Sequence, residues 1–296
     1  MTEATDLLDI IESRMPEFSK GQKRIAFFLI EHYDQAVYLT AARLGEIAGV
    51  SESTVVRFAN ELGFDGYPKL QRALEELVKN RLTAAQRMRV SSERITGKNK
   101  SLLHTVLQSD SDRIFSTLDE IDEDVFNGAV EALLKAKKIY IVGGRSSAPL
   151  SSFLSFYLNL MLDNVVNVSG SNLTEIFEGI FRIDENDIFI AISFPRYSSR
   201  TVQAMQYAGK NGAKTIALTD GTQSPLAQYA DFLLTAHSDM LSFIDSLVAP
   251  LSIINALLVA VSLNKKEELE HSLDKLERLW GEYQVYVPSG NTDKKV

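Results

Sequence analysis

Cysteine is absent from this chain of 296 residues, and tryptophan occurs only once. Without cysteine there can be no disulfide, no thiolate-bound metal and no cysteine nucleophile, and the absence fits a reducing cytoplasm. Hydrophobic residues (45%) and charged residues (24%) occur at ordinary globular frequencies, which excludes extensive disorder and collagen-like or coiled-coil architectures. At roughly 150 residues per domain, the length predicts two domains.

Long hydrophobic runs are also missing. The most apolar stretch, residues 247–263, is interrupted by Pro250, Ser252 and Asn255, so it is too short and too polar to span a membrane. We interpret it as a buried helix that covers a sheet or forms a dimer interface. The acidic first six residues lack the basic and then apolar order of a signal peptide. We therefore expect no membrane partner and a cytoplasmic location.

Basic side chains are fewer than acidic ones, and the formal net charge is −8. Residues 1–90 contain 12 basic and 13 acidic side chains, so nearly all the excess negative charge lies in the rest of the chain. Attraction to a polyanion is therefore not a property of the whole molecule, and any nucleic-acid binding needs a local surface. Residues 81–100 hold six basic side chains against one acid, and we interpret them as a solvated linker or a basic arm that touches phosphates.

The patterns before this linker are helical only. Ser19 and Gln22 have the spacing of a capping box, Thr40 and Ser51 are N-cap candidates, and residues 70–82 carry a helical apolar pattern. Residues 1–80 are thus predicted to form an all-α domain.

After a helical stretch over 102–134, short apolar runs alternate with helical segments. Buried runs of this kind are typical of parallel strands covered on both faces. The predicted strands are 139–142, 165–168, 187–192, 215–218 and 231–234, and helices over 248–263 and 267–280 follow them. Residues 101–286 are predicted to form an α/β domain with a five-stranded, parallel, doubly wound sheet, and 287–296 a polar tail.

Residues 41–60 fit a helix-turn-helix motif. This motif needs a small residue where its two helices approach and a glycine of positive φ at the turn, which Gly45 and Gly49 supply. Apolar side chains that would lock the crossing stand at Leu44, Ala48, Val50, Val55 and Phe58. The same geometry turns the polar side chains of the second helix outward, and these are suited to reading a DNA groove: Ser53, Thr54, Arg57 and Asn60. The alternative is a helical hairpin used only for packing.

The run from Ser51 to Leu70 resembles the signature of RpiR/MurR-type transcriptional regulators. In that family a helix-turn-helix domain is linked to a sugar isomerase (SIS) domain that senses sugar phosphates. The resemblance implies that Ser51, Ser53, Thr54 and Arg57 face DNA, with Tyr67 and Lys69 as backbone contacts.

Two loops of the predicted α/β domain are rich in hydroxyls. Ligands of open α/β sheets bind beyond the carboxyl ends of the strands, where loops meet helix N-termini. The first loop is 143–147 and the second is 193–201. The predicted effector-binding residues are Arg145, Ser146, Ser147, Ser193, Arg196, Ser198, Ser199 and Thr201, together with Thr219 after the fourth strand. The alternative is that the serines only cap their helices.

These loops depart from the usual SIS pattern, which reads Gly-x-Gly-x-Ser in the first loop and Ser-x-Ser-Gly-x-Thr in the second. Arg145 replaces the second glycine, Pro195 and Arg196 replace the second serine and its glycine, and Ser198 replaces the threonine. Arginine binds anions through a bidentate fork. We therefore expect an anionic effector, a sugar phosphate first and a carboxylate-bearing metabolite second.

The favoured function is a ligand-responsive regulator that binds a palindromic, double-stranded DNA operator as a homodimer or homotetramer. The rivals are an SIS-type isomerase, which needs a general base, and a sugar-binding adaptor without DNA affinity. The candidates for such a base are His237, which follows the fifth predicted strand, and Glu175 and Glu178, which lie on a helix after the second. No catalytic residue, cofactor or metal is predicted, because neither metal-ligand spacing nor a nucleotide-binding loop is present.

Overall fold

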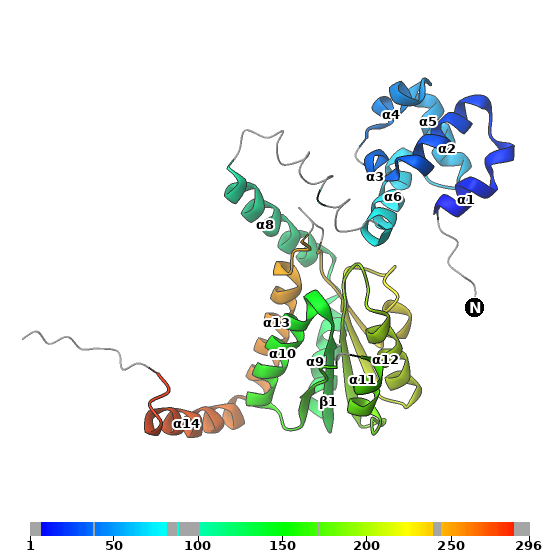
Figure 1. Ribbon diagram of the computed structural model, residues 1–296. Coiled ribbons are helices and arrows are strands. Elements are labelled where there is room, and N and C mark those ends of the chain that lie inside the picture. The colour runs from blue at the N-terminus through cyan, green and yellow to red at the C-terminus, as the bar shows by residue number, and fades with distance from the viewer. Residues whose placement is uncertain are drawn as a thin grey trace, which may run out of the picture. The chain divides into compact units, whose positions relative to one another are not determined.

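The computed structural model describes residues 7–37, 39–81, 88, 101–170, 172–238 and 244–286 (Figure 1). The chain forms two compact units, the first ending at Ser109 and including 239–246, and the second made of Asp110–Ser238 and the chain from Leu247 onward. Apart from residues 81 and 88, the predicted linker 81–100 lies outside the described residues, as does the tail 287–296.

All secondary-structure elements described between residues 7 and 81 of the first unit are helices. Its elements are α1 (Leu7–Ser13), the 3-10 turn η1 (Met15–Glu17), α2 (Lys20–Glu31), α3 (Tyr33–Ala36), α4 (Ala41–Ala48), α5 (Glu52–Glu61) and α6 (Tyr67–Arg81). The predicted capping box opens α2, because Ser19 and Gln22 each bond the other's backbone N–H. Fully buried apolar side chains from α2, α4, α5 and α6 form one core, in which Phe58 packs edge-on against Phe18.

The turn between α4 and α5 has the predicted geometry. A Cβ on Gly45 would stand 2.9 Å from the carbonyl oxygen of Val50, so only glycine lets the start of α5 come this close. Gly49 ends α4 with φ of 65°, the left-handed conformation that glycine adopts without steric cost. The predicted apolar positions Leu44, Val55 and Phe58 are fully buried. The helix-turn-helix prediction is confirmed.

Gly45→Ala is expected to lower the free energy of unfolding of the first unit by about 1–3 kcal/mol, because the added methyl group overpacks a backbone contact. Urea denaturation followed by circular dichroism measures this change. Gly281→Ala is the control, because a Cβ there meets no atom within 4 Å. If both variants unfold like the wild type, the two helices do not approach as closely as described.

The second unit contains a five-stranded parallel sheet. The strands are β1 (Lys138–Gly143), β2 (Val165–Asn167), β3 (Asp187–Ile192), β4 (Lys214–Thr219) and β5 (Phe232–Thr235), in the order β2-β1-β3-β4-β5. The helices are α8 (Leu102–Glu120), α9 (Glu123–Lys135), α10 (Ala148–Met161), α11 (Leu173–Ile180), α12 (Ser199–Lys210), α13 (Val248–Asn264) and α14 (Lys266–Glu282). The predicted fold class is confirmed. The helical stretch 102–134 is two helices, since Asp122 caps a new one.

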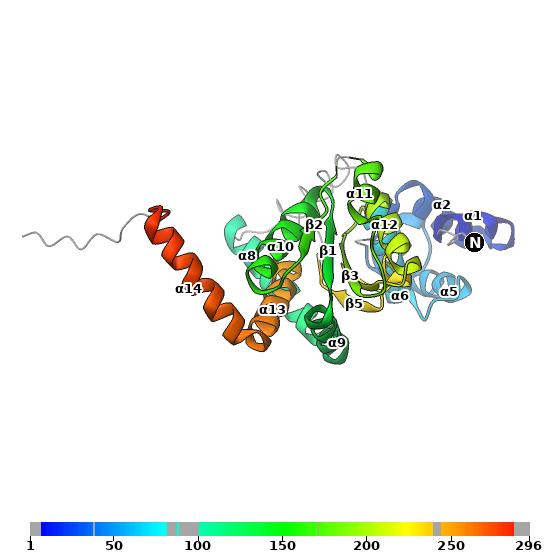
Figure 2. The same ribbon diagram turned by 90° about the horizontal axis from the view of Figure 1, so that it is seen from below.

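Helices cover both faces of the sheet (Figures 1 and 2). α9, α10 and α13 pack on one face, and α11 and α12 pack on the other. Every residue of β3 is therefore buried. This two-sided burial explains why the strands are continuous apolar runs rather than alternating ones.

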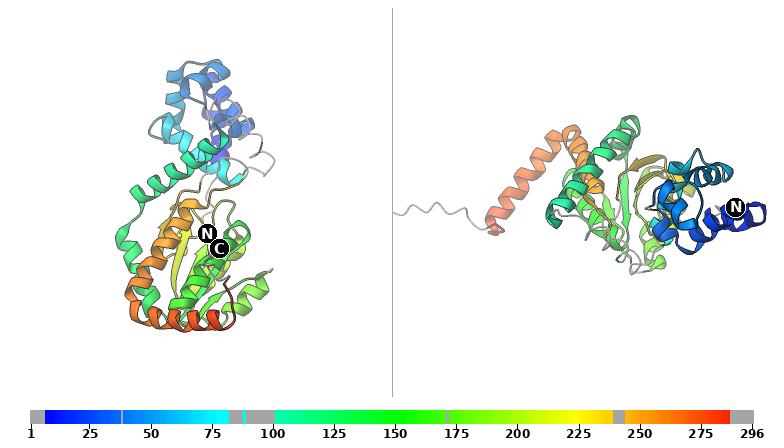
Figure 3. Two further views of the ribbon diagram at one scale, coloured as in Figure 1. Left: turned by 90° about the vertical axis from the view of Figure 1, so that its left-hand side faces the viewer. Right: turned by 90° about the horizontal axis from the view of Figure 1, so that it is seen from above.

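α14 leaves α13 at a bend of 98° and has no buried residue (Figure 3). None of the described helices is by itself long and apolar enough to span a membrane, and α13 and α14 meet that test only as this bent pair.

Candidate DNA-binding surface and effector pocket

The outward face of α5 is polar. Ser53 and Arg57 are exposed and Thr54 is half-buried, while Val55 and Phe58 between them are buried. The hydroxyl of Ser51 lies 2.9 Å from each of the hydroxyls of Ser53 and Thr54. The α5 face thus joins three hydroxyls and a guanidinium, which donate and accept hydrogen bonds in the manner that base edges require.

On this surface the structure contradicts the predicted role of Tyr67, and it gives Ser51 and the exposed Asn60 hydrogen bonds within the domain. Ser51 occupies the N-cap position of α5, but its side chain bonds hydroxyls instead of a backbone N–H. The side-chain oxygen of Asn60 accepts a hydrogen bond from Gly66 N–H at 2.9 Å, which fixes the loop before α6. Tyr67 is only 3% exposed and donates to the carbonyl of Leu39 at 2.8 Å, so its hydroxyl is not placed to contact a phosphate. Lys69 is exposed on the first turn of α6.

Burial raises the pKa of the Tyr67 phenol to about 12. Because this pKa is higher in the folded chain, the phenol ionises first in the unfolded chain as the pH rises. The contribution of Tyr67 to the free energy of unfolding is therefore fully present below pH 10 and is lost as the pH rises toward 12. Tyr67→Phe is expected to remove this alkaline loss from the first unit. Urea denaturation at about pH 8 and about pH 11 tests it. Equal pH dependence in variant and wild type would contradict the assignment.

The second candidate site is a pocket of about 490 Å³ at the carboxyl ends of β1, β2 and β3. β1 lies between β2 and β3 in the sheet, and the chain leaves β1 in the direction of β2 but leaves β3 in the direction of β4. The loops after β1 and β3 therefore diverge and open a crevice between them. A Cβ on Gly144 would stand 3.5 Å from the hydroxyl of Ser198, which places the two predicted loops side by side.

The structure brings five of the nine predicted effector residues to this pocket, which we therefore call the effector pocket as the candidate site. Arg145, Arg196, Ser198, Ser199 and Thr201 line it. The other four predicted residues are not in the lining. Ser193 accepts a hydrogen bond from Ser198 N–H, and Ser147 and Thr219 are buried. Ser146 is exposed. Ser198 also caps α12 through Thr201 N–H, as the capping alternative predicted.

Sequence reasoning missed part of the lining. Ser169 and Gly170, which follow β2, line the pocket, as do Tyr197 and Arg200. Ser169 and Gly170 belong to the loop after β2, and their place directly after a predicted strand was the signal that could have identified this loop as part of the site. For Tyr197 and Arg200 the signal was their place within the loop 193–201.

The effector pocket is electropositive. Arginines come from both predicted loops, and none of the lining residues is Asp, Glu or His. Arg145 has φ of 55°, which is a left-handed conformation that favours glycine. It stands at the position where the usual SIS pattern has glycine. The guanidinium groups of Arg145 and Arg196 make no hydrogen bond or ion pair with the described part of the chain. An anionic ligand would find charge-assisted donors here without a competing carboxylate.

The lining offers no general base for an isomerase. His237 lies outside it, and its Nε2 is 2.9 Å from a carboxylate oxygen of Glu120. Glu175 and Glu178 are exposed on α11, also outside the lining. Within the described residues no group of three His, Asp or Glu side chains could hold a metal ion.

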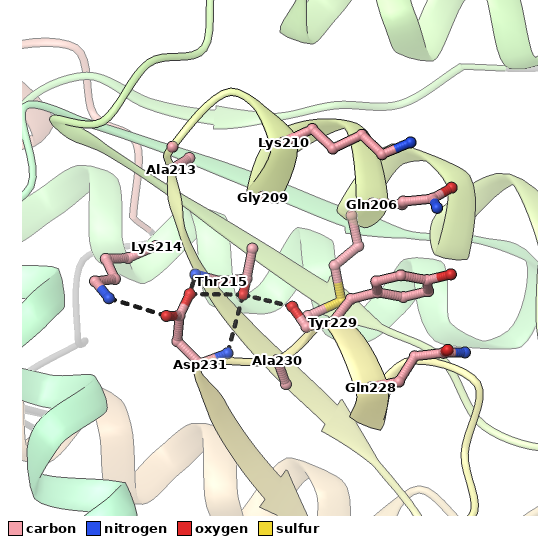
Figure 4. Close-up of a pocket in the computed structure, with 12 residues that line it drawn as sticks. Gln206, Gly209, Lys210, Ala213, Lys214, Thr215, Gln228, Tyr229, Ala230 and Asp231 are labelled. Carbon is pink, nitrogen blue, oxygen red and sulfur yellow. Dashed lines mark hydrogen bonds and ion pairs between the residues drawn. The ribbon is translucent and has the colours of Figure 1, made fainter.

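A second pocket, of about 460 Å³, lies at the amino ends of β4 and β5 (Figure 4). Its floor is a closed hydrogen-bond network in which Asp231 accepts from Thr215 and from Lys214. Burial raises the pKa of the Asp231 carboxyl, but these hydrogen bonds outweigh it and hold the pKa below its ordinary value. The network ties the start of β5 to β4, which is a structural role.

Comparison with known proteins decides between the function classes. The helix-turn-helix domain of the rpiR family matches residues 5–81, and the SIS domain matches residues 132–260. The chain belongs to the RpiR family of transcriptional regulators. It is thus a regulator with a helix-turn-helix and an SIS domain rather than an enzyme.

Relatives of this RpiR-family chain extend over nearly its whole length. The transcriptional regulator HexR of Pseudomonas aeruginosa is 25% identical over 280 residues, which are 92% of this chain and 94% of HexR. The sugar isomerase domain of an RpiR transcription factor from Sphaerobacter thermophilus is 29% identical, with a TM-score of 0.56 over 60% of this chain and 99% of that domain. The Vibrio vulnificus NanR protein, solved in complex with ManNAc-6P, is 20% identical, with a TM-score of 0.58 over 93% of this chain and 97% of NanR.

Proposed function

We propose that this RpiR-family regulator binds a palindromic operator through α5 and alters its operator affinity when an anionic sugar metabolite occupies the effector pocket. The pocket's composition carries the proposal, because arginines from two loops meet hydroxyls and the lining has no carboxylate. A sugar phosphate satisfies both sets of groups, since its anion suits the guanidinium forks and its hydroxyls suit the serines. A carboxylate-bearing sugar is the second candidate on the same chemistry.

The fold relationship to NanR supports a sugar phosphate, because that protein was solved with ManNAc-6P. An isomerase is disfavoured by the lack of an Asp, Glu or His in the lining. An adaptor without DNA affinity leaves the exposed polar face of α5 without a role.

Selection from random double-stranded DNA by the full chain, followed by calorimetry with glucose 6-phosphate, gluconate and 6-phosphogluconate, tests this function. We expect a palindromic motif and binding of at least one phosphorylated sugar. Failure to enrich any motif would contradict the DNA-binding half, and failure of all three compounds would contradict the effector half.

A palindromic operator requires two recognition helices about 34 Å apart, and therefore at least two chains. We propose that the second copy packs on the outer face of α10 and α13. Apolar side chains occur on every side of α13, yet Val259 and Leu263 are 56% and 72% exposed, and Phe156 on the adjacent α10 is 60% exposed. A helix that is hydrophobic all round is normally buried, so a partner is needed to cover this face.

Val259→Glu with Leu263→Glu is expected to convert the dimer or tetramer into monomers, because two charges would be buried without partners. Sedimentation velocity measures the change. Phe181→Glu is the control, because Phe181 is equally exposed (60%) but follows α11 on the other face of the sheet. An unchanged oligomer in the double variant would place the interface elsewhere.

A further inference from the structure

We infer that Asp220 couples occupancy of the effector pocket to helix α8, through hydrogen bonds that run from Tyr197 to Thr117. The inference rests on the proposed function, because it concerns how the effector pocket regulates DNA binding. Asp220 is a positioning residue in this scheme and does not line the pocket.

The first part of this route joins the pocket to the end of β4. Tyr197 lines the pocket, and its hydroxyl donates to a side-chain oxygen of Asp220 at 2.8 Å. The same oxygen accepts from the hydroxyl of Thr219 at 3.2 Å. Thr219 is fully buried, and its hydroxyl is 2.8 Å from that of Ser224. Asp220 is therefore held between a residue of the pocket wall and the buried end of β4.

The second part joins β4 to α8. The N–H of Ala236 donates to the carbonyl of Thr219 at 2.8 Å. The next N–H along, that of His237, donates to the hydroxyl of Thr117 at 2.9 Å, and the His237 ring lies 2.9 Å from the carboxylate of Glu120. Thr117 and Glu120 are both on the last turns of α8. Four of these hydrogen bonds follow one another from the pocket wall to Thr117 on α8, and the contact of His237 with Glu120 is a second link to the same helix.

α8 is sensitive to these bonds because its apolar side chains do not anchor it. Its buried residues are Arg113 and Thr117, both polar, while Leu107, Phe115 and Leu118 are 60% exposed or more. The buried Nε of Arg113 has no hydrogen-bond partner among the described residues. Polar contacts to the segment after β5 therefore contribute a large share of what fixes α8.

α8 is also placed to pass a change on. The division between the two compact units falls inside it, between Ser109 and Asp110, and the chain before it leads back to the helix-turn-helix unit. A continuous helix moves as one body, so a displacement at Thr117 also moves the part of α8 that belongs to the first unit, up to Ser109.

Ligand binding changes the first bond of the route. A phenol has one proton to donate. An anion in the effector pocket competes with Asp220 for the Tyr197 hydroxyl, so the ligand favours the state in which Asp220 has lost this donor. This difference in contacts between the two states is what a ligand needs to shift a conformational equilibrium.

Hydrogen exchange of the full chain, read by mass spectrometry on peptides from residues 102–120, tests the coupling without any ligand. Tyr197→Phe removes one hydroxyl and is expected to speed exchange in α8 by about three- to tenfold, because Asp220 and the end of β4 lose the hydrogen bond that joins them to the pocket wall. Thr117→Val should have the same effect, and Thr117→Ser, which keeps the hydroxyl, should exchange like the wild type. Tyr229→Phe is the matched control, because it makes the same chemical change in the second pocket.

A double-mutant cycle identifies Asp220 as the intermediate. Asp220→Ala should speed exchange in α8 as Tyr197→Phe does, and the two changes together should add nothing further, since they break the same link. Exchange in β3 peptides checks that each variant stays folded. Faster exchange in Thr117→Val but not in Tyr197→Phe would overturn the route, and additive effects would remove Asp220 from it.

Glucose 6-phosphate and 6-phosphogluconate serve as ligand probes. In the wild type a probe that protects peptides from 143–147 and 193–201 should speed exchange in α8, and in Tyr197→Phe it should protect the pocket without changing α8. Protection of the pocket with α8 unchanged in the wild type overturns the coupling and leaves the proposed function standing. If neither probe protects the pocket, the proposed effector class fails, while the ligand-free comparison still decides the coupling.

Discussion

Arg57→Ala is expected to weaken operator binding by about 1–3 kcal/mol and to relax the base preference at one position in each half-site. Arg57 is exposed on α5, and only its Nε makes a hydrogen bond within the described residues, to the carbonyl of Ser53 at 3.3 Å. Its other guanidinium nitrogens are therefore available to the acceptor atoms of a guanine. Titration of the selected DNA and of single-base variants measures both effects.

The fold should tolerate this change, because the Arg57 side chain is exposed. Arg43→Ala is the matched control. Arg43 is on α4, is exposed and pairs with Glu46 in its own helix, so its loss should leave the base preference unchanged. If Arg57→Ala binds with wild-type affinity and preference, α5 is not the reading helix. A uniform loss across all sequences would make Arg57 a phosphate contact instead.

Removing either pocket arginine is expected to lower effector affinity by about 1.5–3 kcal/mol, which is roughly ten- to a hundredfold. Arg145 and Arg196 come from the loops after β1 and β3 and line one pocket, so each would lose a charge-assisted hydrogen bond to the same ligand. Operator affinity without effector should barely change, because neither residue is in the helix-turn-helix unit. Calorimetry with the sugar panel and DNA titration measure the two affinities separately.

Arg145→Gly is a sharper variant than Arg145→Ala. The backbone of Arg145 has φ of 55°, which glycine adopts without strain and alanine does not. Arg145→Gly therefore removes the charge while relieving the backbone, so reduced affinity together with unchanged or raised stability isolates the electrostatic contribution. Arg182→Ala removes an equal charge outside the pocket lining and serves as the control for both arginines.

If the two arginines instead pair with acidic residues across the dimer, their variants would lose dimerisation and stability along with effector affinity. Sedimentation of Arg145→Gly and Arg196→Ala distinguishes the two accounts. An effector bound equally well by wild type and both variants would remove the arginines from the site.

Local patterns in the sequence determined the elements and the helix-turn-helix. The capping box at Ser19, the positive φ of Gly49 and the close approach at Gly45 each depend on a few neighbouring residues, so spacing alone predicts them. The strands could also be predicted from the sequence, because burial on both faces of the sheet leaves continuous apolar runs. The parallel order then brought the two predicted loops to one crevice.

Only the tertiary structure decided which polar side chains are available to a ligand. The hydroxyl of Tyr67 bonds the carbonyl of Leu39, which is 28 residues away, and burial there removes it from the DNA-facing surface. Thr219 likewise turns into the domain, whereas the unpredicted Ser169 and Tyr197 complete the effector pocket. Thr117 of α8 is buried because its hydroxyl accepts from the backbone N–H of His237 after β5, more than a hundred residues later in the chain. Periodicity and capping are local and can be read from sequence, but burial and long-range hydrogen bonds depend on which distant segments the fold brings together.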